Sequence, residues 1–179
     1  MARKIVVAPD SRLNQVCVEC DCADKSLVGL IKDMTKFMYE TQGVGIAAPQ
    51  VGDNRRVVVI DVNYDSEDQE SRDPMILLNP VVLETSGEIV EDKEGCLSFP
   101  GINVPVKRPE FVKVAFTDLN GDEWEIEGDG LLSRCLQHEI DHLNGRTLFD
   151  AVDKSLKLQV MAEYENAKRK GARPGSVEV

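Results

Sequence analysis

Apolar residues recur at helical spacing near both ends of the chain. Between positions 24 and 42 they lie three and four residues apart, so they share one face of a helix. This stripe comprises Leu27, Leu30, Ile31, Met34, Phe37 and Met38. Asp24 is placed to cap the start of the helix and Gly43 to end it. A second helix, which carries Leu156, Val160, Met161 and Tyr164, is predicted from about position 153 to position 170.

The pattern changes to short extended runs in the middle of the chain. Strands are predicted at residues 56–62, 75–83, 88–90, 111–117 and 124–127. The last two alternate in polarity and are joined by Asn120-Gly121, which is a hairpin signal. Residues 63–74 are polar and acidic without periodicity, so we expect a loop or a mobile insertion there. The middle of the chain is therefore expected to be antiparallel sheet.

The stretch CLQHEIDHLNG (residues 135–145) contains both histidines of the chain. His138 and His142 are four residues apart, so on a helix they lie on one face and can bind one metal ion. Glu139 can reach a water molecule on that ion without being a ligand, which makes this HExxH pattern a metal site with a general base. A chance match is the alternative, but the pattern uses both histidines and has helical periodicity. Apolar residues on two sides predict that this helix is buried, and Gly145 is placed to end it.

Length and composition indicate one globular protein. The chain has 179 residues, of which 42% are apolar and 30% are charged. We expect a single domain over residues 1–170 and a disordered tail over residues 171–179, which contain Gly171, Pro174 and Gly175. The formal net charge of −11 argues against DNA as a ligand. No signal peptide and no apolar stretch of about 20 residues are present, so we expect a cytoplasmic protein that does not bind a membrane.

The histidine pair leaves a catalytic metal site one ligand short, because such sites take three protein ligands and keep one open position. An extended histidine pattern would place the third ligand at position 148, which is Leu148, so the ligand must be a carboxylate or a cysteine. Cys96 is favoured, whereas Cys135 is too close on the same helix. The alternatives for Cys96 are a buried apolar side chain or a nucleophile that uses His138 as its base. A Cys-His-His set suits zinc, and also ferrous iron, nickel or cobalt.

The remaining cysteines form a separate cluster. Cys17, Cys20 and Cys22 have the spacing CxxCxC, which could bind zinc. A closed structural site needs a fourth ligand, and no histidine or cysteine follows nearby. We therefore expect reduced thiols here.

The stretch GVGIAAPQ (residues 43–50) resembles a dinucleotide-binding pattern in its letters alone. That pattern follows a strand and opens a helix, but here the stretch follows a helix and leads into a strand. Its small residues instead suggest a backbone that lies close to another group. Gln50 either donates a hydrogen bond to a ligand or is a solvated residue in a turn.

Three segments together resemble a known family. In order and spacing, GVGIAAPQ, EGCLS (residues 94–98) and QHEIDHLNG (residues 137–145) resemble the three motifs of peptide deformylases. The resemblance covers most of the chain, from about Ile5 to Asp150. It implies an α+β fold with antiparallel β-sheets packed around a central metal-binding HExxH helix.

The resemblance also implies a reaction and its residues. The substrate would be the N-formylmethionine at the start of a nascent polypeptide, and the product would be formate. The implied metal ligands are Cys96, His138 and His142, with Glu139 as the acid and base. Gln50 and the backbone N–H of Leu97 would stabilise the oxyanion. Ferrous iron is the implied metal in the cell, with Zn²⁺, Ni²⁺ or Co²⁺ as substitutes.

Further expectations concern the substrate and the partners. The predicted substrate-binding residues are Val44, Gly45, Glu94, Gly95, Leu131 and Cys135. A zinc endopeptidase of the HExxH type and a non-enzymatic module with a structural metal are the alternative functions. A basic cluster of Lys168, Arg169, Lys170 and Arg173 suggests transient docking on the ribosome. The alternative for this cluster is a solvated helix end whose cations complement the helix dipole.

Overall fold

The structure is a computed structural model that describes residues 3–175. Its helices are α1 (Ser26–Glu40), α2 (Gly130–Leu143), α3 (Leu148–Ala151) and α4 (Lys157–Arg169). Its strands are β1 (Gly45–Ala47), β2 (Val57–Ile60), β3 (Met75–Gly95), β4 (Asn103–Thr117) and β5 (Glu123–Gly128). Short 3-10 turns lie at Ser11–Asn14, Ala48–Val51 and Gln69–Ser71. The strands form one antiparallel sheet in the order β1-β2-β3-β4-β5.

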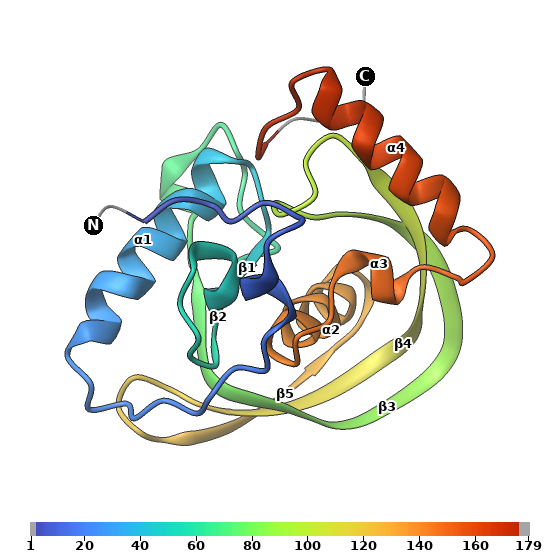
Figure 1. Ribbon diagram of the computed structural model, residues 1–179. Helices are drawn as coiled ribbons and strands as arrows, with labels where there is room; N and C mark the ends of the chain where they lie inside the picture. Colours follow the sequence, from blue (N-terminus) through green and yellow to red (C-terminus); the bar gives the residue numbers. More distant parts are fainter. Residues whose placement is uncertain (1–2, 176–179) are drawn as a thin grey trace.

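β3 and β4 form a long curved hairpin, and α2 lies inside its curve (Figure 1). The hairpin runs from the pair Leu78 and Thr117 to the pair Gly95 and Asn103, with register shifts at three places. Such irregularities bend a strand and increase its twist. The two short strands predicted at 75–83 and 88–90 are therefore parts of one curved strand. Its last residue, Gly95, directly precedes Cys96.

α2 is buried along most of its length, as its sequence predicts. Leu136, Ile140 and Leu143 pack in one apolar cluster with side chains of the sheet. The helix is followed by Gly145, which has a φ of 71°. A Cβ at this glycine would lie 2.7 Å from the carbonyl oxygen of Asn14, so both the backbone angle and the space require glycine.

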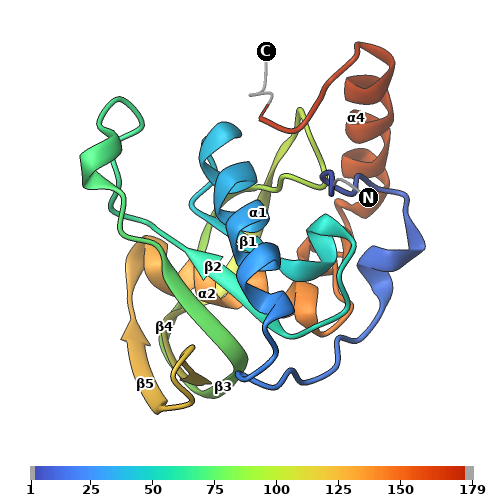
Figure 2. The same cartoon turned by 90° about the vertical axis from the view of Figure 1, so that its left-hand side faces the viewer.

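α1 packs its apolar stripe against β1 and β2, and Figure 2 shows the helix in front of these strands. The N-cap residue is Lys25 rather than the predicted Asp24, but the Asp24 carboxylate accepts a hydrogen bond from the Ser26 N–H at 2.8 Å in the turn that precedes the helix. The end of the helix differs from the prediction. Gln42 adopts the positive φ of 55° that glycine usually provides. Gly43 instead donates its N–H to the Met38 carbonyl at 2.8 Å and leads into β1.

The acidic segment 63–74 is a loop, as predicted, and it is attached to the end of α1. The Tyr64 hydroxyl donates to the Gly43 carbonyl at 3.1 Å. The Tyr64 ring also meets the ring of Tyr39 edge to face, with centroids 4.9 Å apart. The Arg72 guanidinium lies over the Tyr39 ring, with its Cζ 4.4 Å from the ring centroid. These contacts fix the loop against the chain that leads into β1.

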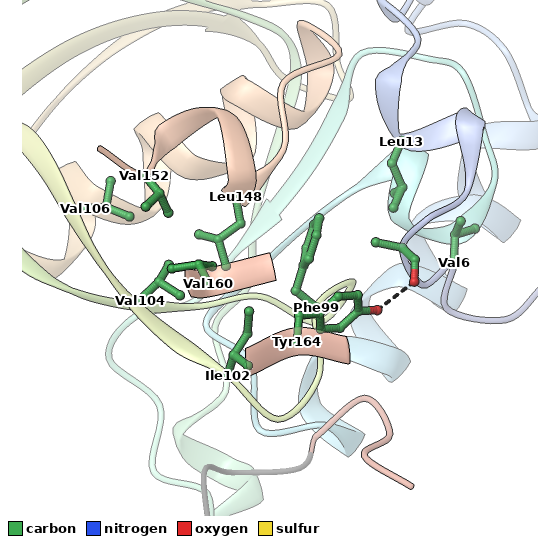
Figure 3. Packing of buried hydrophobic residues seen from close by; sticks show 11 residues of the cluster. Val6, Leu13, Phe99, Ile102, Val104, Val106, Leu148, Val152, Val160 and Tyr164 are labelled. Atoms are coloured by element: carbon green, nitrogen blue, oxygen red, sulfur yellow. Dashed lines mark hydrogen bonds between the residues drawn. The ribbon is translucent and has the colours of Figure 1, made fainter. Parts of the chain in front are cut away.

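A third apolar cluster lies where α3 and α4 meet the N-terminal arm and the chain after Cys96 (Figure 3). Tyr164 packs against Phe99 with ring centroids 5.3 Å apart, and its hydroxyl donates to the Ala8 carbonyl at 2.7 Å. The predicted last helix is present but begins later, and α3 was not predicted. This core supports the segment that carries Cys96.

The tail predicted to be disordered is described as far as Gly175, where it forms a turn after α4. Positions 176–179 lie outside the described residues. No helix within residues 3–175 has both the length and the apolar character needed to cross a membrane.

Candidate metal centre and active site

Three side chains from two distant segments converge beside α2. Cys96 follows β3, while His138 and His142 come from successive turns of α2. Their ligand atoms all lie within 4.8 Å of one another. The Cys96 Sγ is 3.3 Å from the His142 Nε2. The structure therefore brings together the three side chains that the sequence singled out, and Cys135 is not among them.

This donor set fits a metal ion. One thiolate and two imidazole nitrogens suit Zn²⁺, Fe²⁺ and related ions. The buried Oε2 of Glu139 has no hydrogen-bond partner within the described part of the chain. Buried polar atoms nearly always have a hydrogen-bond partner, so we expect this carboxylate oxygen to bind a polar group in the space next to Cys96 and the two histidines. A water molecule on a bound ion would meet that need.

Glu139 is buried next to the ligands, and burial raises its pKa to about 7. The backbone of β1 presses against it. A Cβ at Gly45 would lie 2.8 Å from the Glu139 Oε1 and 2.6 Å from the Cys135 Sγ. The close backbone approach predicted for residues 43–50 is thus found at Gly45. A carboxyl group with a pKa near neutrality is suited to take up and return a proton.

Gln50 is buried, with 1% of its surface exposed, so the alternative of a solvated glutamine is wrong. Its Oε1 accepts a hydrogen bond from the Ala47 N–H at 2.8 Å. Its Nε2 is directed at the Cys96 Sγ, 3.6 Å away, and at the Ser98 Oγ, 3.3 Å away. The amide is therefore held with its donor side toward the metal ligands.

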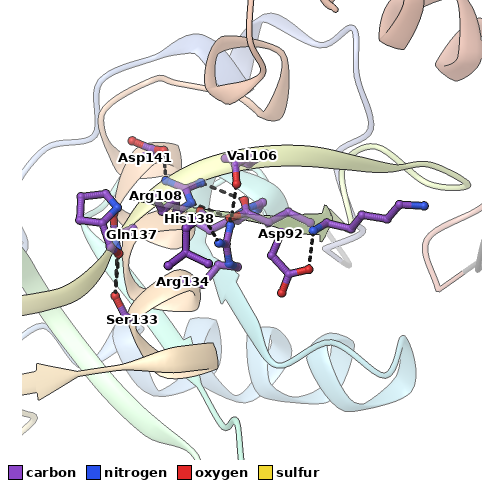
Figure 4. A network of polar contacts seen from close by, with 12 residues as sticks. Asp92, Val106, Arg108, Ser133, Arg134, Gln137, His138 and Asp141 are labelled. Atoms are coloured by element: carbon purple, nitrogen blue, oxygen red, sulfur yellow. Dashed lines mark hydrogen bonds and ion pairs between the residues drawn. The ribbon is translucent and has the colours of Figure 1, made fainter. Parts of the chain in front are cut away.

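An ion-pair network that was not predicted from the sequence contacts the His138 ring at its Nδ1 (Figure 4). The His138 Nδ1 lies 2.9 Å from the Glu94 Oε2, which leaves Nε2 for a metal ion. Arg108 donates to both oxygens of Glu94, at 2.6 and 2.9 Å, and Arg134 donates to one at 2.8 Å. Arg108 also donates to Asp141 at 2.9 Å. Such outer contacts orient a ligating imidazole and set its tautomer.

The network keeps Glu94 ionised. Burial by itself would raise the pKa of Glu94, but hydrogen bonds with His138 and Arg108 hold this pKa well below its usual range. The Glu94 carboxylate is bound to His138, Arg108 and Arg134. Its side chain therefore orients His138 and is not available to bind a substrate.

A cavity of about 310 Å³ opens over the ligands. Its lining includes Gln50, Cys96, His138 and Glu139, and all the predicted substrate-binding residues: Val44, Gly45, Glu94, Gly95, Leu131 and Cys135. Leu97 lines it as well. Burial raises the pKa of the Cys135 thiol well above its usual value, so this side chain stays neutral and forms an apolar wall. Asn103 and Arg134 also line the cavity, and of these two only Arg134 was not singled out from the sequence.

The cysteines of the N-terminal arm form no second metal site within the described residues. Cys17, Cys20 and Cys22 are free thiols, and the one cluster of metal-binding groups found in residues 3–175 is the Cys-His-His set. Burial raises the pKa of Cys17 to about 11. That these thiols are reduced in the cell stays a prediction.

A Cys-His-His set beside a buried glutamate, at the end of a cavity in an α+β fold, defines a metal-dependent hydrolase of the HExxH type. The sequence model of the polypeptide deformylase family matches residues 2–157. The chain is 41% identical to the peptide deformylase of Methylocella silvestris, over 96% of this chain and 87% of that protein. It is 45% identical to peptide deformylase 1 of a Nostoc species, over 83% of this chain and 78% of that protein.

Comparison with solved structures leads to the same family. A peptide deformylase from Legionella pneumophila superposes with a TM-score of 0.84 and 38% identity, over 95% of this chain and 97% of that one. One from Synechococcus elongatus, in complex with actinonin, gives 0.83 and 39%, over 99% and 92% of the two chains. This chain belongs to the polypeptide deformylase family. It is an enzyme that hydrolyses the formyl group from peptides that begin with N-formylmethionine, and the predicted family, fold class and function are confirmed.

Proposed function

We propose that this deformylase works with one metal ion held by Cys96, His138 and His142. The observation that carries the proposal is the convergence of three ligand atoms within 4.8 Å, next to a buried glutamate with an unpaired oxygen. The donor set is compatible with Zn²⁺, Ni²⁺ and Co²⁺, and we propose Fe²⁺ as the ion used in the cell. When bound, the ion supplies Lewis-acid chemistry, since it lowers the pKa of a water molecule and polarises a carbonyl group.

Glu139 is the proposed acid and base. Its carboxylate accepts a proton from the attacking water, whose oxygen bonds to the formyl carbon. The C–N bond of the formamide then breaks, and Glu139 returns the proton to the leaving nitrogen. The products are formate and a free amino terminus. Burial raises the pKa of Glu139 toward neutrality in the metal-free chain, which suits a group that takes up a proton and returns it.

Gln50 and Leu97 are the proposed oxyanion donors. The Gln50 amide is already oriented by its hydrogen bond with the Ala47 N–H, so it loses little freedom when it donates. Leu97 directly follows Cys96 and lines the same cavity, which supports its backbone N–H as the second donor. One such donor contributes about 3–4 kcal/mol at the transition state.

The cavity explains the proposed selectivity. Val44, Leu131 and Cys135 offer apolar surface for a methionine side chain. Gly45 lies tight against Glu139, which leaves room for a formyl group but crowds larger acyl groups.

Metal content and formate release test the proposal together. The protein is purified without oxygen, its metals are measured, and formate release from formyl-Met-Ala is followed after each metal is restored. Glu139→Ala is expected to lower kcat by about a hundredfold or more, the scale of acid–base help, with its bound metal retained. A near-normal rate in this variant would remove Glu139 from the mechanism.

We also propose the cellular setting. Residues 1–170 form the catalytic domain, and the enzyme acts in the cytoplasm on nascent chains during protein biosynthesis. Docking on ribosomal RNA would use the basic end of α4 and the residues after it: Lys168, Arg169, Lys170 and Arg173. Cosedimentation with ribosomes at low and high salt, for the wild type and for Arg169→Glu/Lys170→Glu, tests this docking. Equal cosedimentation of both proteins would contradict it.

A further inference from the structure

The substrate cavity has a buried inner end and an exposed outer end. Residues 41–45 form one wall, along which burial increases from the exposed Gln42 to the buried Gly45 beside Glu139. Residues 99–103 also line the cavity, and Gly101 is half-buried. Because the formyl group must reach the inner end, the rest of a bound peptide leaves through the outer end near Thr41 and Gly101.

The chain after α4 is fixed at its start and lies against one side of this outer end. Gly171 has a φ of 83° and turns the chain, and the Ala172 N–H donates to the Ala167 carbonyl at 3.0 Å. Ala172 lies directly against Gly101, where a Cβ would come within 2.7 Å of the Ala172 Cβ. The turn after α4 therefore rests on the 99–103 segment.

Residues 172–175 then cross to the other side. Gly175 lines the cavity itself, together with Thr41 and Gly101. A Cβ at Gly175 would lie 3.3 Å from the Thr41 Cα and 3.4 Å from the Thr41 Cβ. Figures 1 and 2 both show the segment after α4 returning toward the C-terminal end of α1. We call residues 172–175 the strap, because they connect two sides of the outer end.

The strap is held more firmly at α4 than at α1. Its first residue takes part in the hydrogen-bonded turn that ends α4, whereas Gly175 touches Thr41 without a side chain of its own. Gly175 is exposed and has no side chain to anchor it. An exposed end of this kind opens at lower free-energy cost than the hydrogen-bonded turn at Ala172, so the strap can swing about Gly171 while α4 stays in place.

We propose that the strap makes deformylation depend on peptide length. It covers the outer end over short formyl peptides, and longer peptides must displace it to leave the cavity. This inference rests on the metal centre and catalytic residues proposed for the same site, and it assigns a specificity role to residues 172–175.

A disulfide that locks the strap tests the inference. The 3.4 Å between the Thr41 Cβ and a Cβ at Gly175 is close to the separation of about 3.8 Å found in disulfides. Thr41→Cys/Gly175→Cys is prepared with its metal, oxidised, and assayed on formyl-Met-Ala and on a formyl-Met peptide several residues longer. The ratio of kcat/KM for the long peptide to that for the short one is expected to fall by about tenfold or more on oxidation. Reduction should restore it. Gly175→Cys alone, treated identically, is the matched control.

Truncation supplies the complementary measurement. A chain that ends at Gly171 lacks the strap, and a chain that ends at Gly175 keeps it. The long-to-short ratio is expected to rise in the first chain and to stay at the wild-type value in the second.

Two outcomes would overturn the strap: a ratio unchanged by a disulfide verified by mass spectrometry, or equal ratios in the two truncated chains. Gly175 has a φ of 84°, which strains a cysteine there, so the truncated chains decide the matter when the disulfide does not form. Absence of formate from both peptides in the metal-loaded wild type would instead overturn the proposed function.

Discussion

Gly45 and Glu139 pack so closely that no methyl group fits between them. A Cβ at Gly45 would come within 2.8 Å of the Glu139 Oε1. The glycine belongs to β1 at the edge of the sheet, and the glutamate belongs to α2. The position of the proposed base therefore depends on the distance between an edge strand and the central helix.

Gly45→Ala should inactivate the enzyme without unfolding it. The new methyl group must push Glu139 or Cys135 aside, and a displacement of about 1 Å in a catalytic group can cost about a hundredfold in rate. The loss is measured as kcat/KM for formyl-Met-Ala, with circular dichroism to verify the fold. Gly29→Ala is the matched control, because a Cβ there meets nothing within 4 Å and alanine favours the helix. Wild-type activity in Gly45→Ala would contradict the close packing.

Glu139→Gln should make the metal-free protein more stable at neutral and higher pH. Burial raises the pKa of Glu139 to about 7 in the folded chain, above its ordinary value of 4.5. The stability that its protonated form contributes is complete below about pH 4.5 and is lost as the pH rises through about 7. Glutamine cannot ionise, so it avoids a loss of about 3 kcal/mol at most. Urea unfolding of both metal-free proteins across this range measures the difference, and a difference that does not change with pH would refute the assignment.

Arg108→Met should weaken metal binding although Arg108 is no ligand. The substitution leaves the buried Glu94 carboxylate with fewer donors and removes a partner of Asp141. Breaking a buried ion pair costs about 3–5 kcal/mol of stability, and losing the support of a ligating imidazole lowers metal affinity by about 10–100-fold. Competition with a chelator measures the affinity. Lys113→Met removes an exposed ion pair with Glu125 and should leave the affinity unchanged. Equal affinities in all three proteins would count against the network.

Tyr64→Phe should raise KM with little change in kcat. It removes the hydrogen bond to the Gly43 carbonyl, which fixes the wall of the cavity that leads into β1. A bond of this kind contributes about 0.5–1.5 kcal/mol, which corresponds to a two- to tenfold increase in KM. Tyr164→Phe loses the same kind of bond to the Ala8 carbonyl and should lower the melting temperature with KM unchanged. The idea fails when both variants change KM equally.

Most of the correct predictions came from patterns of residues that lie close together in the sequence. The spacing of His138 and His142 identified α2 and placed the two histidines on one face of it, because that geometry depends on one helical turn alone. The apolar stripe of α1 was likewise identified from its helical spacing. The choice of Cys96 needed elimination and the resemblance of three motifs, since nothing local to a cysteine identifies a partner far along the chain. The structure places its sulfur 3.3 Å from the His142 Nε2, which is compatible with that choice.

Contacts between residues far apart in the chain, and several backbone details, were not predicted from the sequence. Arg108 is 14 residues from Glu94 and 33 from Asp141, and no short pattern joins these charges. β3 was divided into two strands because its register shifts interrupt the alternation of apolar and polar residues. β1 has three small or apolar residues, too few for a periodic signal. The positive φ at Gln42 was missed because Gly43 next to it is the more usual helix terminator.

The distance between the ligands along the chain has a further consequence. Cys96 and His138 are 42 residues apart (138 − 96), and the intervening chain contains β4 and β5. An ion bound to both residues cross-links this loop, and an unfolded chain cannot hold its ligands together in the same way. Metal binding therefore favours the folded state by mass action. A newly made chain that has not yet acquired its ion would be the form most readily cut by cellular proteases.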